Sequence, residues 1–177
     1  MKEELERALR EIAAPDNVAL EYAVIPASAI EFSSQVREAC EVNACGKYNR
    51  CWTCPLAVGS VEKHIEKITS YPFAFVFSAV FALEDSFDYE GMAKAKALHD
   101  KLTGGLHEKF GKTNPVYGAG GCTLCEVCAY PEPCVFPDKT FASVEAAGIN
   151  VTKLSLAADL SYNNGENTVT YFSMILF

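Results

Sequence analysis

Residues 72–83 read Pro-Phe-Ala-Phe-Val-Phe-Ser-Ala-Val-Phe-Ala-Leu, and this stretch decides the fold. Its apolar residues alternate between two faces of an extended chain, with Phe73, Phe75, Phe77, Phe81 and Leu83 on one face and Ala74, Val76, Val80 and Ala82 on the other. A strand that is apolar on both faces is typically covered by other elements on both sides. We therefore predict that it lies at the centre of a sheet.

The flanking segments supply further strands and helices around this strand. Alternation predicts strands at 18–25, 115–119 and 168–177, and short extended pieces at Ile30–Phe32 and Ile149–Val151. Apolar residues at helical spacing predict helices over 3–13, 35–41, a segment that starts after Ser60, 88–110 and 154–162. Gly104-Gly105 weakens the longest of them and is a candidate break.

This order predicts an α+β fold. We expect a single domain over residues 1–177, with a mixed or antiparallel sheet flanked by helices. Two Cys-rich metal-binding loops, 40–55 and 120–137, extend from this frame. With 177 residues, half of them apolar, packing alone suffices to fold most of the chain.

The charge balance argues against two classes of partner. The net charge is −8, and the 15 Lys and Arg residues form no run, so we expect neither nucleic acid nor an anionic membrane surface as a partner. The start of the chain is a charged amphipathic helix rather than a secretory signal, and the longest apolar stretch is too short to span a bilayer. We therefore predict a cytoplasmic protein with reduced thiols.

All eight cysteines fall into two groups of four. The first cysteine group is Cys40-x4-Cys45-x5-Cys51-x2-Cys54, followed by Pro55. The second cysteine group is Cys122-x2-Cys125-x2-Cys128-x5-Cys134. Structural cysteines scattered through a core would not divide in this way, so the pattern predicts that all eight are metal ligands.

The spacing favours iron–sulfur clusters over zinc. Three cysteines at Cys-x2-Cys-x2-Cys spacing with a fourth beyond resemble the ligands of bacterial ferredoxin [4Fe-4S] clusters, in which a cysteine often precedes a proline, as Cys54 does. Zinc sites more often use two separated Cys-x2-Cys pairs or add a histidine. Since both windows lack histidine, we predict one or two [4Fe-4S] clusters, with zinc as the alternative cofactor and a thiol switch or disulfides as the third interpretation.

Other residues near the cysteines allow two interpretations. Gly118–Gly121 either brings backbone N–H groups close to a cluster or forms a tight turn after a strand. Tyr48, Trp52 and Tyr130 either shield a cluster from water or pack in the ordinary way. His99 and His107 are expected to be solvent-exposed residues of the 88–110 helix. No residue can be assigned a catalytic role.

Two stretches resemble the motifs of a known family. The segment from Cys45 through Trp52 to Pro55 and the segment from Gly118 to Val151 are similar to the two motifs of an uncharacterised cysteine-rich family described as "predicted metal-binding protein". The resemblance covers most of the chain and implies metal ligands at Cys40, Cys45, Cys54, Cys122, Cys125, Cys128 and Cys134. The family more often has another residue at the position of Cys51, and a second proline where this chain has Leu56.

Three hypotheses for function follow. In the first, all eight cysteines hold two clusters that pass electrons to a redox partner protein in an anaerobe. In the second, Cys51 is not a ligand, and a three-cysteine cluster leaves one iron open in an enzyme or sensor, beside Tyr48, Arg50 or Glu145. In the third, two zinc sites fasten the loops of an interaction module. The substrate, the partner and the oligomeric state do not follow from the sequence.

Overall fold

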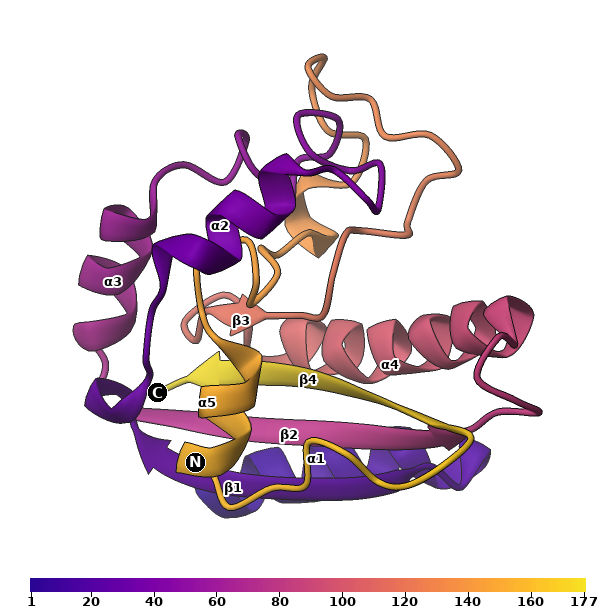
Figure 1. The fold of residues 1–177 in the computed structure, drawn as a ribbon. Helices are drawn as coiled ribbons and strands as arrows, with labels where there is room; N and C mark the ends of the chain where they lie inside the picture. Colours follow the sequence, from indigo (N-terminus) through magenta and orange to yellow (C-terminus); the bar gives the residue numbers. More distant parts are fainter.

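The computed structural model describes residues 1–177 and contains one four-stranded antiparallel sheet (Figure 1). The strands lie in the order β1-β2-β4-β3. Their bounds are Ala19–Pro26 for β1, Phe73–Ala82 for β2, Val116–Tyr117 for β3 and Thr168–Leu176 for β4. β2 pairs with β1 on one side and with β4 on the other, which confirms the predicted central strand and the α+β class.

Two helices cover one face of the sheet. α1 (Lys2–Ala13) packs beside α4 (Tyr89–Phe110), and both rest on the phenylalanine face of β2. The core there contains Leu5, Leu9, Phe75, Phe77, Leu102, Leu106 and Ile175. Gly105 is close to Ile12, because a Cβ at 105 would lie 2.8 Å from Ile12 Cδ1. The candidate break at Gly104-Gly105 does not occur, and α4 is continuous. Gly105 instead lets α1 and α4 approach closely.

The other face of the sheet is covered by shorter elements. These are the 3-10 turn η2 (Ala27–Ala29), α3 (Val61–Thr69) and α5 (Val151–Ala157), of which α5 lies in front of the sheet in Figure 1. The core on this side contains Ile25, Ile68, Val76, Ile149, Leu154 and Met174. Phe32 and Ile149, both predicted to be extended, form an isolated antiparallel bridge. None of the helices has the combination of length and hydropathy that a membrane crossing needs.

The bounds of α5 differ from the predicted 154–162 helix for local reasons. The side chain of Asn150 accepts a hydrogen bond from the backbone N–H of Lys153 at 3.1 Å and caps the helix, so the helix begins at Val151. Asp159 has a φ of 53°, in the left-handed region, and the helix ends before it. Val151 was expected to be extended, and this expectation is wrong.

His99 contradicts the expectation of an exposed helix residue. It is fully buried between α4 and the sheet, and its Nε2 lies 2.7 Å from Oγ of Ser173. Its ring packs between those of Phe77 and Tyr171, with centroids 5.5 Å and 5.7 Å away. A polar residue is tolerated here because Ser173 supplies a hydrogen-bond partner. Burial, together with the charge of Lys96, lowers the pKa of His99 to about 3.

We predict that His99 makes the fold less stable as the pH falls. Its pKa is lower in the folded state than in the unfolded chain, so below about pH 6.5 the unfolded state binds the proton that the folded state excludes. The free energy of unfolding should drop through this residue by about 1.4 kcal/mol per pH unit between the unfolded and folded pKa values. Urea unfolding of the wild type and of His99→Gln at about pH 7.5 and pH 5.5 measures this, and an equal pH dependence of the two proteins would contradict it.

Candidate metal centre

The first cysteine group sits on α2 (Ser34–Glu41) and on the loop that follows it. α2 carries Cys40 in its last turn, and the chain then turns at Asn43, Gly46 and Asn49, which all have positive φ. The side chain of Asn43 accepts a hydrogen bond from the backbone N–H of Tyr48 at 3.0 Å and fixes the first of these turns. Through these turns the loop bends back toward α2, so that Cys54 and Cys40 face one cavity.

Three cysteines of the first group line this cavity, which has a volume of about 480 Å³. They are Cys40, Cys45 and Cys54, and Cys51 is absent from the lining. The other walls come from α2, from Gly120 and Gly121 after β3, and from the segment before α5, and include Tyr48, Ser143, Glu145 and Asn150. The volume lies within the range that small-molecule sites have. We call this space the three-cysteine cavity.

Cys51 has a different environment. Its side chain is completely buried, and its Sγ lies 3.3 Å from Oγ1 of Thr53. The interaction between the Cys51 and Cys54 side chains lowers the pKa of Cys51, and together with burial it raises the pKa of Cys54. Cys51 therefore lies next to Cys54 but does not face the three-cysteine cavity.

The second cysteine group lies on the long loop between β3 and the 3-10 turn η3 (Pro137–Lys139). All four of its cysteines, Cys122, Cys125, Cys128 and Cys134, line one narrow cavity of about 10 Å³ together with Trp52, Thr53 and Thr140. The backbone N–H of Leu124 points at Sγ of Cys122 from 3.5 Å. The cavity is narrow, so this loop, which contains no helix or strand, would have to widen to enclose a metal ion or cluster.

The two cysteine-bearing loops pack against each other, as Figure 1 shows at the top of the molecule. Nε1–H of Trp52 donates to the carbonyl oxygen of Glu132 at 2.9 Å, and its ring meets that of Tyr130 edge to face at 5.0 Å. The hydroxyl of Tyr130 donates to the side chain of Asn49 at 3.1 Å. These aromatic residues therefore join the loops, and Tyr48 instead lines the three-cysteine cavity.

Thr53 is the most buried contact between the loops. Its Oγ1 accepts a hydrogen bond from the backbone N–H of Cys122 at 3.0 Å, and its carbonyl oxygen accepts one from Ser143 at 3.3 Å. Only 3% of Thr53 is exposed. A single residue between Cys51 and Cys54 thus sets the position of the first cysteine of the second group, a role that the sequence pattern does not indicate.

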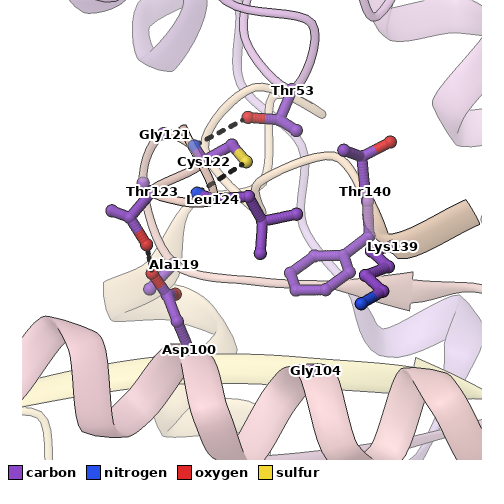
Figure 2. Close-up of a pocket in the computed structure, with 12 residues that line it drawn as sticks. Thr53, Asp100, Gly104, Ala119, Gly121, Cys122, Thr123, Leu124, Lys139 and Thr140 are labelled. Carbon is purple, nitrogen blue, oxygen red and sulfur yellow. Dashed lines mark hydrogen bonds between the residues drawn. The ribbon is translucent and has the colours of Figure 1, made fainter. Parts of the chain in front are cut away.

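α4 fixes the same segment from the opposite side. Figure 2 shows Asp100 below Thr123, whose hydroxyl donates to Oδ2 of Asp100 at 2.7 Å. Lys96 pairs with Asp100 at 2.6 Å and lies 3.4 Å from the carbonyl oxygen of Gly121. The (i, i+4) spacing of Lys96 and Asp100 indicates a helical ion pair, but nothing in the sequence indicates its contact with the loop.

The backbone at the glycines before Cys122 passes close to a cysteine thiol. This is the arrangement expected if Gly118–Gly121 brings backbone N–H groups close to a cluster. A Cβ at Gly121 would lie 3.4 Å from Sγ of Cys54 and 2.9 Å from Cγ of Lys47. Gly120 has a φ of 58°, and its N–H donates to Oε2 of Glu145 at 3.1 Å. The chain therefore passes directly beside a thiol of the first group.

Two of the cysteines that line these cavities, Cys40 and Cys122, hold their protons more firmly than free cysteine does. Burial raises the pKa of Cys40, and the carboxylate of Glu145 raises it further. Burial also raises the pKa of Cys122. A metal must displace these protons to bind, so metal loading will release protons and depend on pH.

The donor set is rich in sulfur and poor in other ligands. No histidine lines either cysteine cavity, and Glu145 is the one carboxylate that does. No three His, Cys, Asp or Glu side chains converge closely enough to hold a single metal ion. Soft thiolates of this kind suit iron–sulfur clusters and zinc, and they do not suit magnesium or calcium.

Fold and site together define an α+β protein with two adjoining cysteine-rich loops. The profile of the family described as "Predicted metal-binding protein" (domain of unknown function 2284) matches residues 23–177, and the chain belongs to this family. No curated protein and no solved structure matches the chain significantly.

We predict that removing the Thr53 hydroxyl weakens the contact between the two loops and lowers the free energy of unfolding. Thr53→Val keeps the shape but leaves the N–H of Cys122 without a partner, which should cost about 1–3 kcal/mol of stability. Thr53→Ser keeps the hydroxyl and serves as the matched control. Urea unfolding measures the effect, and a valine variant as stable as the serine variant would contradict it.

Proposed function

We propose that this chain is an iron–sulfur protein that holds two clusters and transfers electrons to a partner protein. The observation that carries the proposal is the contact between the two cysteine groups, in which Thr53 touches Cys51 and Cys122 at once. Clusters held on two loops in direct contact are close neighbours. Bound clusters of this type supply one-electron chemistry.

The cavities support an assignment of ligands. Cys122, Cys125, Cys128 and Cys134 would hold one cluster, because all four line one cavity. Cys40, Cys45 and Cys54 would hold the other, because they share the three-cysteine cavity. The position of Trp52 against Tyr130 would keep water away from the junction of the two loops.

The net charge supports a protein partner, and the free cysteines support a reducing location. The net charge of −8 favours docking on a basic surface, where electrostatics raises the rate of encounter more than the affinity. Eight free cysteines fit a reducing compartment, for which we propose the cytoplasm of an anaerobe.

The three-cysteine cavity favours a second candidate function for the first cysteine group. A cluster with three cysteine ligands has one iron open to a further ligand, and the cavity provides room for a small molecule beside it. Glu145 and Tyr48 line the same space and would contact such a molecule. The protein would then be an enzyme or sensor in which the second cluster supplies electrons to the first.

Metal analysis tests the proposal itself. Protein purified without oxygen should contain about eight iron and eight acid-labile sulfide per chain, as two [4Fe-4S] clusters require. Reduction should produce a paramagnetic resonance signal from two interacting clusters. Stoichiometric zinc without sulfide would contradict the proposal and support two structural zinc sites.

Serine variants test the ligand assignment on which the second candidate function depends. We predict that Cys51→Ser retains both clusters, because Cys51 does not line the three-cysteine cavity, whereas Cys45→Ser loses about half of the iron. Cys128→Ser should lose the other half and serves as the control for the second group. If Cys51→Ser loses as much iron as Cys45→Ser, Cys51 is a ligand, and the first group has no open iron.

A further inference from the structure

A separate cavity of about 440 Å³ lies on the side of the molecule formed by α3, β3 and the end of α4. Figure 1 shows these elements below the two cysteine-bearing loops. Its walls contain Lys67, Lys112, His64 and His107, and none of its 13 lining residues is acidic. This is unexpected in a chain with 23 acidic and 15 basic residues, and it marks a local excess of positive charge.

The two lysines at this cavity have no carboxylate partner. Four lysines of α4, by contrast, each form an ion pair: Lys94, Lys96, Lys101 and Lys109. Lys67 and Lys112 form none, and both are exposed, so their ammonium groups are free to reach a ligand. Each ammonium group carries three hydrogen-bond donors.

His107 has an unsatisfied nitrogen beside the cavity. Its Nε2–H donates to the carbonyl oxygen of Asp138 at 3.1 Å, whereas its buried Nδ1 has no hydrogen-bond partner. Nδ1 lies next to Gly111, which also lines the cavity, because a Cβ at Gly111 would lie 2.3 Å from it.

Aromatic side chains form part of the remaining walls. Tyr71, Tyr117 and Phe141 line the cavity. Tyr117 is held by His64, since Nε2 of His64 donates to the carbonyl oxygen of Val58 at 3.0 Å and leaves Nδ1 to accept from the Tyr117 hydroxyl at 3.2 Å. Aromatic walls with a few charged groups are typical of sites for small organic ligands.

We propose that this cavity binds a small molecule that carries a phosphate or carboxylate group, with Lys67 and Lys112 as its charged donors. Thr140 lines both this cavity and the one between the four cysteines of the second group. The ligand therefore contacts the segment that closes the second cysteine-bearing loop. The site is independent of which metal the cysteines hold.

Helix electrostatics gives a competing explanation for the two lysines. Lys67 lies near the C-terminal end of α3, and Lys112 follows the end of α4, where cations stabilise the helix dipole. In that case their removal would lower stability without any effect on binding, so the experiment has to measure binding directly.

Isothermal titration calorimetry tests the proposal. The metal-loaded protein is titrated at low salt with inorganic phosphate and, separately, with benzoate. We expect saturable binding of at least one probe in the millimolar range or tighter. The probe that binds shows whether phosphate or carboxylate ligands are preferred. The double variant Lys67→Gln/Lys112→Gln should bind about tenfold more weakly, because it loses two charged donors.

The matched control is Lys63→Gln/Lys153→Gln, which removes the same charge from two exposed lysines outside the cavity. It should bind as the wild type does. The proposal is overturned if neither probe binds, or if the two double variants bind equally well.

Discussion

The hydrogen bonds of Thr53 hold the two cysteine-bearing loops together, and the proposed metal centre depends on them. Thr53 lies between Cys51 and Cys54 of the first group. It accepts hydrogen bonds from the backbone N–H groups of Cys122, in the second group, and of Ser143. The loops contain no helix or strand near this point that would set their relative position. The hydrogen bonds of Thr53 on the first loop therefore fix the position of the second loop, as hydrogen bonds between paired strands fix their register. On the opposite side, the Lys96–Asp100 pair of α4 holds the same segment.

The sheet and its two helical layers support these loops without taking part in their chemistry. One core of 15 residues and another of 11 lie on the two faces of the sheet, and neither contains a cysteine. Burial of this apolar surface stabilises the frame independently of metal. In the proposed function, the cysteine-bearing loops would rearrange around a cluster while the frame stays folded. The cavity with Lys67 and Lys112 lies on this frame, next to the segment that leads out of the second loop.

The elements with strong periodicity were predictable from the sequence. The alternation of 72–83 and the helical spacing of 3–13 and 88–110 correspond closely to β2, α1 and α4, since each buries a complete apolar face. His99 was misjudged because its partner, Ser173, comes from a strand 74 residues later. α5 was misplaced because a single capping side chain, that of Asn150, decides where it begins.

The site was predictable in composition but not in arrangement. The grouping of cysteines identified the residues that line the two cavities. Spacing alone did not set Cys51 apart, whereas the family resemblance, with another residue more often at this position, already suggested that Cys51 differs. That difference arises from burial against Thr53, a contact that spacing does not encode. The roles of Lys96 and Asp100 also depend on tertiary contacts alone.

A crystal structure of the oxygen-free protein, with anomalous diffraction recorded at the iron and zinc edges, tests the central claim most directly. The account predicts iron at two neighbouring positions, one enclosed by Cys122, Cys125, Cys128 and Cys134, and the other against Cys40, Cys45 and Cys54. Anomalous density for zinc at these positions, or a single metal site shared by the two groups, would contradict it.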